Sequence, residues 1–190
     1  MTWVESDLTF FFPAGWGIRK YDKQRFYRFM SGLGMKGVDF LLLSPEGEQH
    51  LYLMEVKNYR TRSTEEGIFT PILRTPEDLA KHLFAKYDHT IRAIRAIELF
   101  YQRKWWYRLL EKQFRQSLRF TQDVVFWAHT FPLVRSPLQH SLVLWLEADN
   151  LPPEYIVSLQ QALAEYIKDG KLQIHISNGE KPFHPGIISQ

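Results

Sequence analysis

A chain of 190 residues without cysteine excludes disulfide-stapled scaffolds, thiolate nucleophiles and cysteine-ligated metal sites. It is most simply one domain, long enough to bury well over half of its unfolded surface. Glu5 and Asp7 stand where a signal peptide would carry positive charge, and the apolar run after them is too short to cross a membrane. We therefore expect a cytoplasmic protein without a membrane partner.

Positive charge is concentrated in the middle of the chain. Lys and Arg minus Asp and Glu give −1 for residues 1–56, +7 for residues 57–120 and −3 for residues 121–190. A basic centre favours an anionic partner, of which nucleic acid is the commonest, whereas a solvated helical face explains the same charges without a partner.

The first part of the chain predicts a helix followed by a β-hairpin. Apolar side chains at helical spacing place the helix over residues 22–32. Two apolar runs then flank a cluster of proline, glycine and acidic residues. This pattern predicts a hairpin over residues 37–57 that closes through Glu46, Gly47 and Glu48.

Two helices are predicted next. Thr75 suits an N-cap, Pro76 suits the first helical position, and Asp78 suits the first turn of a long amphipathic helix that extends to Tyr101. A second, basic helix is expected over residues 104–118.

The last part of the chain contains three apolar runs that favour strands. They cover residues 123–129, 141–148 and 171–177, and a helix over residues 153–170, closed by Gly170, lies between the last two. Helices that alternate with near-continuously apolar strands predict a central mixed sheet covered on both faces. The expected fold class is a three-layer α/β/α domain.

The hairpin register places two carboxylates opposite each other. Side chains alternate along a strand, so Leu53, Glu55 and Lys57 share one face. With the turn at residues 46–48, Asp39 lies directly across from Glu55, and their Cβ atoms are about 4.5–5.5 Å apart.

Two carboxylates this close repel each other and are costly to bury without compensation. Lys57 supplies one positive charge, so a structural ion pair is one explanation of the set. The other is an active site. Carboxylate oxygens bind hard divalent cations such as Mg²⁺, and an ammonium group can orient a water molecule or contact a phosphate.

The stretches GVDFLLL and LYLMEVKNYR resemble the signature of the PD-(D/E)xK nuclease superfamily, in which an acid on one strand is followed by Glu-x-Lys or Asp-x-Lys on the next. Asp39, Glu55 and Lys57 match these positions. The order of elements over residues 20–177 also resembles the core of the restriction-endonuclease-like fold. The resemblance implies a single nuclease-like domain over residues 1–190 that hydrolyses DNA phosphodiester bonds as an endonuclease.

The resemblance also implies a metal cofactor, Mg²⁺ or Mn²⁺. Asp39 and Glu55 would bind it, with the backbone carbonyl of Val56 as a further ligand. Many members carry a glutamate on the first helix, where this chain has only Asp22, which is a candidate ligand or an N-cap. Because that glutamate is missing, a non-catalytic nuclease-fold module for nucleic-acid binding or protein assembly is the alternative function.

Basic and aromatic side chains supply a candidate DNA-binding surface. Three residues follow the motif at the strand end and could reach the DNA backbone near the cut: Tyr59, Arg60 and Arg62. Two helical stripes could neutralise phosphates, although a solvated face explains them equally well. The stripes are Arg92, Arg95 and Arg103 on the first long helix, and Arg108, Lys112, Arg115 and Arg119 on the second.

Three aromatic residues, Trp105, Trp106 and Tyr107, begin the second basic helix. They could stack on bases. Two tryptophans at a helix start more often belong to the core or to an oligomer contact, which leaves a homodimer open.

Overall fold

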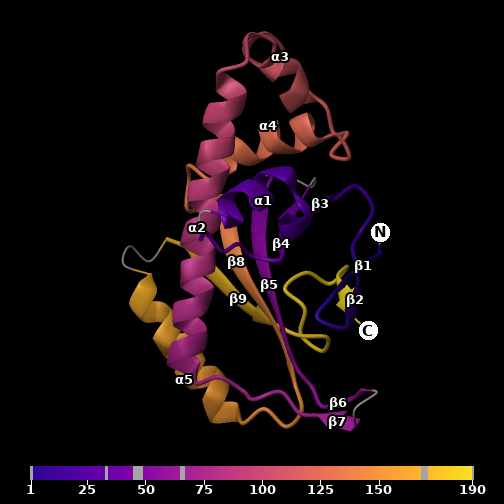
Figure 1. Cartoon of the computed structure of the whole chain (residues 1–190), viewed down its shortest axis with the longest axis vertical. Coiled ribbons are helices and arrows are strands. Elements are labelled where there is room, and N and C mark those ends of the chain that lie inside the picture. Colours follow the sequence, from indigo (N-terminus) through magenta and orange to yellow (C-terminus); the bar gives the residue numbers. More distant parts are fainter. Residues whose placement is uncertain (1, 33, 45–48, 65–66, 168–170, 190) are drawn as a thin grey trace.

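The computed structural model describes residues 2–32, 34–44, 49–64, 67–167 and 171–189. A mixed sheet of five strands forms its centre, in the order β3-β4-β5-β8-β9 (Figure 1). The first three strands are antiparallel, and β5, β8 and β9 are parallel. The strand bounds are Gly17–Lys20 for β3, Phe40–Leu43 for β4, Leu51–Tyr59 for β5, His140–Ala148 for β8 and Gln173–Ser177 for β9.

Two small sheets contain the other strands of the described residues. One contains β1 (Thr2–Glu5), β2 (Leu8–Phe11) and β10 (Ile188–Ser189), with β2 in the middle, so segments from both ends of the chain belong to one sheet (Figure 1). The other is a hairpin of β6 (Arg62–Thr64) and β7 (Gly67–Phe69) that follows the end of β5.

Five α-helices and one 3₁₀ helix join the strands. Their bounds are Tyr21–Lys23 for the 3₁₀ helix η1, Arg25–Ser31 for α1, Pro76–Gln102 for α2, Trp105–Gln116 for α3, Asp123–Leu133 for α4 and Pro153–Tyr166 for α5. The start of α2 confirms the prediction, because the Thr75 side chain accepts a hydrogen bond from the backbone N–H of Asp78 and Pro76 occupies the first turn. Gly170, the expected cap of the last helix, lies outside the described residues.

The predicted strand over residues 123–129 is wrong, because this segment forms helix α4. Its residues are buried almost all round, among them Val125, Phe126, Trp127 and Ala128. A helix that is apolar on every side has no 3.6-residue periodicity, so its sequence resembles that of a buried strand.

The helices pack on one face of the central sheet. The larger core cluster joins side chains of β4, β5 and β8, such as Leu41, Leu53 and Leu144, to residues of α2, α4 and α5. On the other face, Phe40, Met54 and Trp145 pack against the N-terminal strands and the C-terminal segment. That second cluster contains no helical residue in the described part of the chain.

In the described part of the chain, the second face therefore has no helical layer of the kind that the sequence led us to expect. The parallel connections from β5 to β8 and from β8 to β9 step along the sheet in one direction. Right-handed crossovers in one direction put their helices on the same face. The apolar strands of the N-terminus cover the face that remains, through residues such as Leu8 and Phe10.

The predicted register of the β4–β5 hairpin is confirmed. Phe40 pairs with Met54 and Leu41 pairs with Leu53. The same register, extended by one residue, sets Asp39 against Glu55, and the Asp39 N–H donates to the Met54 carbonyl at 3.0 Å. The turn at residues 46–48 lies outside the described residues. No described helix is long and apolar enough to span a membrane.

Candidate active site

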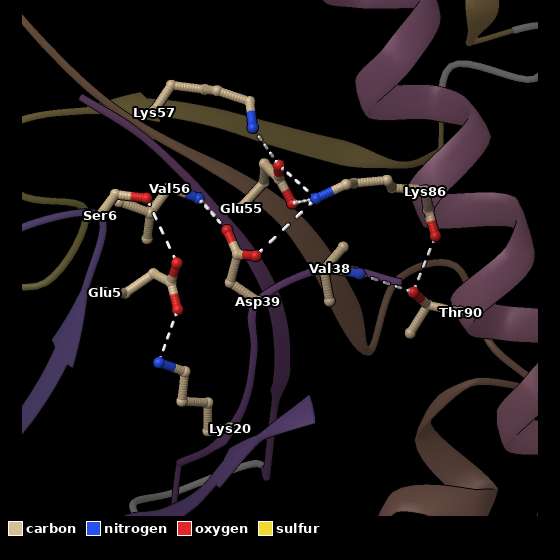
Figure 2. A network of polar contacts seen from close by, with 10 residues as sticks. All are labelled: Glu5, Ser6, Lys20, Val38, Asp39, Glu55, Val56, Lys57, Lys86 and Thr90. Atoms are coloured by element: carbon tan, nitrogen blue, oxygen red, sulfur yellow. Dashed lines mark hydrogen bonds and ion pairs between the residues drawn. The ribbon is translucent and has the colours of Figure 1, made fainter. Parts of the chain in front are cut away.

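Glu55 is the centre of a buried network on the helix-covered face of β5 (Figure 2). Its side chain is only 1% exposed. Lys57, two residues further along the strand, places its Nζ 2.6 Å from Glu55 Oε1. Lys86, from α2, places its Nζ 2.6 Å from Oε1 and 2.8 Å from Oε2. Two ammonium groups therefore neutralise one buried carboxylate.

Asp39 joins the same network from the residue before β4. Its Oδ2 accepts a hydrogen bond from the Val56 backbone N–H at 2.8 Å, and its Oδ1 lies 3.7 Å from Lys86 Nζ. Burial and the nearby charge of Glu55 raise the pKa of Asp39 to about 7, against the opposing effects of Lys86 and the Val56 hydrogen bond. The charge of Glu5 raises it slightly further.

Lys86 is the residue of this site that sequence reasoning missed. Burial disfavours its ammonium form, but the attraction of Glu55 and Asp39 outweighs burial and raises the pKa of Lys86. A signal was present, because Lys86 follows Leu79 and Leu83 on the buried side of α2. A lysine at such a position must have an anionic partner or reach solvent.

Thr90 fixes α2 against the hairpin. Its fully buried hydroxyl donates to the Lys86 carbonyl at 2.7 Å and accepts from the Val38 N–H at 3.1 Å. The backbone before Asp39 is therefore tied to the helical turn that carries Lys86.

Two further acids lie near the site without contacting its carboxylates in the described residues. Glu5, in β1, pairs with Lys20 at 2.8 Å and accepts a hydrogen bond from the Ser6 hydroxyl at 3.2 Å. Asp22, in η1, caps no helix, so the N-cap interpretation is wrong. Its Oδ1 is buried and has no hydrogen-bond partner in the structure, and its role as a metal ligand stays a prediction.

A small cavity of about 140 Å³ opens beside Glu55. Four basic side chains line it: Lys36, Lys57, Arg74 and Lys86. Among the described residues, the side chains of Lys36 and Arg74 form no ion pair. The cavity therefore offers more positive charge than Glu55 can neutralise, an environment that suits a phosphate group.

The carboxylates of Asp39 and Glu55 are suitable ligands for a hard divalent cation, but they are only two side chains. No group of three or more His, Asp or Glu side chains within the described ranges stands close enough to hold a metal ion. Asp39 and Glu55 supply carboxylate oxygens, and burial, together with the charge of Glu55, raises the pKa of Asp39 despite the nearby Lys86. The Val56 carbonyl stays a predicted ligand.

The three predicted DNA contacts after the motif have partners within the protein. Tyr59 packs against the core on the helix face. Arg60 pairs with the buried Glu147 at 2.7 Å, and Arg62 pairs with Asp7. Neither arginine forms an ion pair with Asp39 or Glu55 among the described residues.

The first basic stripe begins at Arg92, about 9 Å along α2 from Lys86, and the second lies farther from the carboxylates. α3 lies beyond the C-terminal end of α2, whereas β6 and β7, which follow β5, lie at the opposite end of the molecule (Figure 1). From Lys86 to the end of α2 the helix extends for roughly 25 Å. All seven residues are exposed: Arg92, Arg95, Arg103, Arg108, Lys112, Arg115 and Arg119.

The second stripe is not continuous, because α3 ends at Gln116 and Arg119 lies outside it. The expected helix over residues 104–118 included Ser117, whose extended backbone ends the helix instead. Arg115 pairs with Glu111 at 2.7 Å, as expected for a solvated helical face.

The aromatic residues at the start of α3 divide between core and surface. Tyr107 is buried, whereas Trp105 is 70% exposed. Trp106 lines an apolar pocket with Phe29 and Phe100. The core interpretation of the two tryptophans is wrong, because Trp105 and Trp106 are both exposed, and the homodimer stays a prediction.

Comparisons of the chain with family models, with curated proteins and with solved structures find no match. The functional argument therefore depends on the geometry around Glu55.

Proposed function

We propose that this protein is a metal-dependent nuclease that hydrolyses DNA phosphodiester bonds, acting as an endonuclease. One observation carries the proposal. Asp39, Glu55 and Lys57, which match the spacing of a nuclease motif, converge from the two strands of one hairpin beside a cavity rich in positive charge. A random acid-x-lysine match would lack both the opposed carboxylate and the cavity.

The order of elements supports the same proposal. The antiparallel strands β3, β4 and β5, the helical crossover through α2, and the parallel strand β8 follow one another as in the restriction-endonuclease-like core. We propose such a core for residues 20–177, with the sheet of β1, β2 and β10 in place of a second helical layer.

Each residue has a defined task in this mechanism. Asp39 and Glu55, with the Val56 carbonyl, would hold Mg²⁺ or Mn²⁺. When bound, the ion would lower the pKa of a water ligand and stabilise charge on the leaving oxygen. Lys57 would orient the attacking water and contact the phosphate. Lys36 and Arg74 line the cavity and would bind the neighbouring DNA backbone.

A specific observation favours the second candidate, a non-catalytic nuclease-fold module that binds nucleic acid or a protein. The Lys86 ammonium group already lies between Asp39 and Glu55, where a metal ion would bind. A module that never binds metal would be stabilised by this arrangement.

Incubation of supercoiled, linear and branched DNA with Mg²⁺, Mn²⁺ or EDTA tests the nuclease. We expect cleavage that requires metal and disappears in Lys57→Ala. Lys81→Ala, at an exposed position of α2, is the matched control and should cleave normally. Cleavage in EDTA, or undiminished cleavage by Lys57→Ala, would refute the mechanism. DNA binding without cleavage in any metal would identify the non-catalytic module.

A further inference from the structure

The charges of the site already balance without a metal ion. Three lysines and three acids form the network in Figure 2: Lys20 pairs with Glu5, Lys57 pairs with Glu55, and Lys86 contacts both Glu55 and Asp39. A divalent cation added to this set would leave two uncompensated positive charges at a largely buried position. Such an excess is unfavourable in a low-dielectric environment.

We propose that Lys86 is a built-in counter-ion that occupies the cation position between Asp39 and Glu55 and leaves it when a divalent metal binds. This inference rests on the proposed function. It assigns to Lys86 a role that the motif lysine, Lys57, does not have.

The geometry separates the two lysines. Lys57 belongs to the same strand as Glu55 and contacts one of its oxygens. Lys86 comes from a different element and contacts both Glu55 oxygens, with Asp39 3.7 Å away. A cation that bridges two carboxylates occupies the position of a metal ion, so Lys86 and the metal compete.

The Lys86 side chain also has a second position that it can adopt. Its backbone is fixed by the Thr90 hydroxyl, but its side chain is 24% exposed and ends a flexible four-carbon stem. The same side chain lines the cavity that Lys36 and Arg74 border. A rotation about the stem would move the ammonium group from the carboxylates into this cavity.

The cavity is where a DNA phosphate would bind, so metal and substrate should help each other. A phosphate in the cavity attracts the Lys86 ammonium group away from Asp39 and Glu55, which leaves both carboxylates available to the metal. By linkage, bound metal must then increase DNA affinity by the same factor. The site would thus bind metal weakly until DNA arrives.

Metal affinity measured by calorimetry tests the competition. Lys86→Met keeps the length of the side chain without its charge, and we expect it to bind Mg²⁺ about tenfold to a hundredfold more tightly than the wild type. Lys86→Arg, which keeps the charge, should bind Mg²⁺ as weakly as the wild type. Lys81→Met, on the exposed side of α2, is the control and should change nothing. Equal Mg²⁺ affinity in Lys86→Met and the wild type would overturn the inference.

A second measurement needs only the wild-type protein, in case Lys86→Met fails to fold. Ca²⁺ affinity is measured with and without a short DNA duplex. We expect the duplex to tighten Ca²⁺ binding severalfold, and an unchanged affinity would overturn the inference.

The outcomes separate this inference from the proposed function. Metal-dependent DNA cleavage by the wild type, together with unchanged Mg²⁺ affinity in Lys86→Met, would remove the counter-ion role and leave the nuclease standing. Absence of both metal binding and cleavage in every variant would overturn both.

Discussion

Asp39→Asn should stabilise the metal-free protein at pH 8 and stabilise it to a smaller extent at pH 5. The substitution removes the ionisable group, while the amide oxygen can still accept the hydrogen bond from Val56. It also removes the repulsion between Asp39 and Glu55. Lys86 keeps its two close contacts with Glu55, so no buried charge loses its nearest partner.

The magnitude follows from the pKa of Asp39, which rises from the usual 3.8 to about 7 in the folded protein. A carboxyl whose pKa is higher in the folded state favours folding when protonated. The stabilisation of the folded state by the protonated Asp39 carboxyl is fully present below pH 3.8 and is lost as the pH rises through about 7. The complete loss amounts to about 4 kcal/mol, of which about 2–3 kcal/mol falls between pH 5 and pH 8. Because the Asp39 side chain is 18% exposed, we expect the lower value.

Urea denaturation in EDTA at pH 5 and pH 8 measures the effect. The free energy of unfolding of the variant, relative to the wild type, should rise by about 2 kcal/mol between the two pH values. Asp88→Asn, at a half-exposed carboxylate of α2, is the control and should show a constant difference. Added Mg²⁺ at pH 8 should stabilise the wild type and leave Asp39→Asn unchanged.

One result would refute this reasoning. If Asp39→Asn were less stable than the wild type at pH 8, the ionised carboxylate would be a net stabilising partner of Lys86. Asp39 and Lys86 would then form a structural ion pair, and Asp39 and Glu55 would not be a repulsive pair that holds a cation.

Three further substitutions test other parts of the structure. Arg60→Ala should lower the free energy of unfolding by about 1–2 kcal/mol, because buried Glu147 loses a cationic partner, and an unchanged urea midpoint would leave Arg60 available for DNA. Arg108→Ala with Lys112→Ala should reduce the slope of log DNA affinity against log salt by about 2, and an unchanged slope would assign the stripe to a solvated face. Thr90→Val should cost about 1–3 kcal/mol in urea denaturation, since it removes two buried hydrogen bonds, whereas Thr90→Ser should retain most of the stability.

The hairpin could be predicted from the sequence because the pattern that specifies it lies within one short segment of the chain. Side chains alternate with a period of two, and a slip of one residue would turn Leu41 and Leu53 from the helix-covered face to the opposite face of the sheet. The register that buries these leucines also sets Asp39 against Glu55. The position of the two carboxylates thus follows from the alternation of side chains along each strand and from the turn predicted at residues 46–48.

The features that the sequence did not predict depend on contacts between distant segments. α4 is apolar on every side, so no periodicity marks it as a helix. The partner of Lys86 lies 31 residues away in the chain, on an element whose packing angle no local pattern specifies. Arg60 and Glu147 meet only because β5 and β8 are neighbours in the sheet.

Buried Glu55 needs nearby cations for the stability of the fold, whereas a nuclease would need a metal ion at the same carboxylate. A carboxylate that is 1% exposed is costly to bury without cations nearby, and Lys57 and Lys86 supply them. Removal of one such partner commonly costs 3–5 kcal/mol, so the same ammonium group that competes with a metal also supports the fold. The two lysines would thus allow the protein to fold without a metal ion. Its site would then exchange one cation for another, and only the exchanged state would carry out hydrolysis.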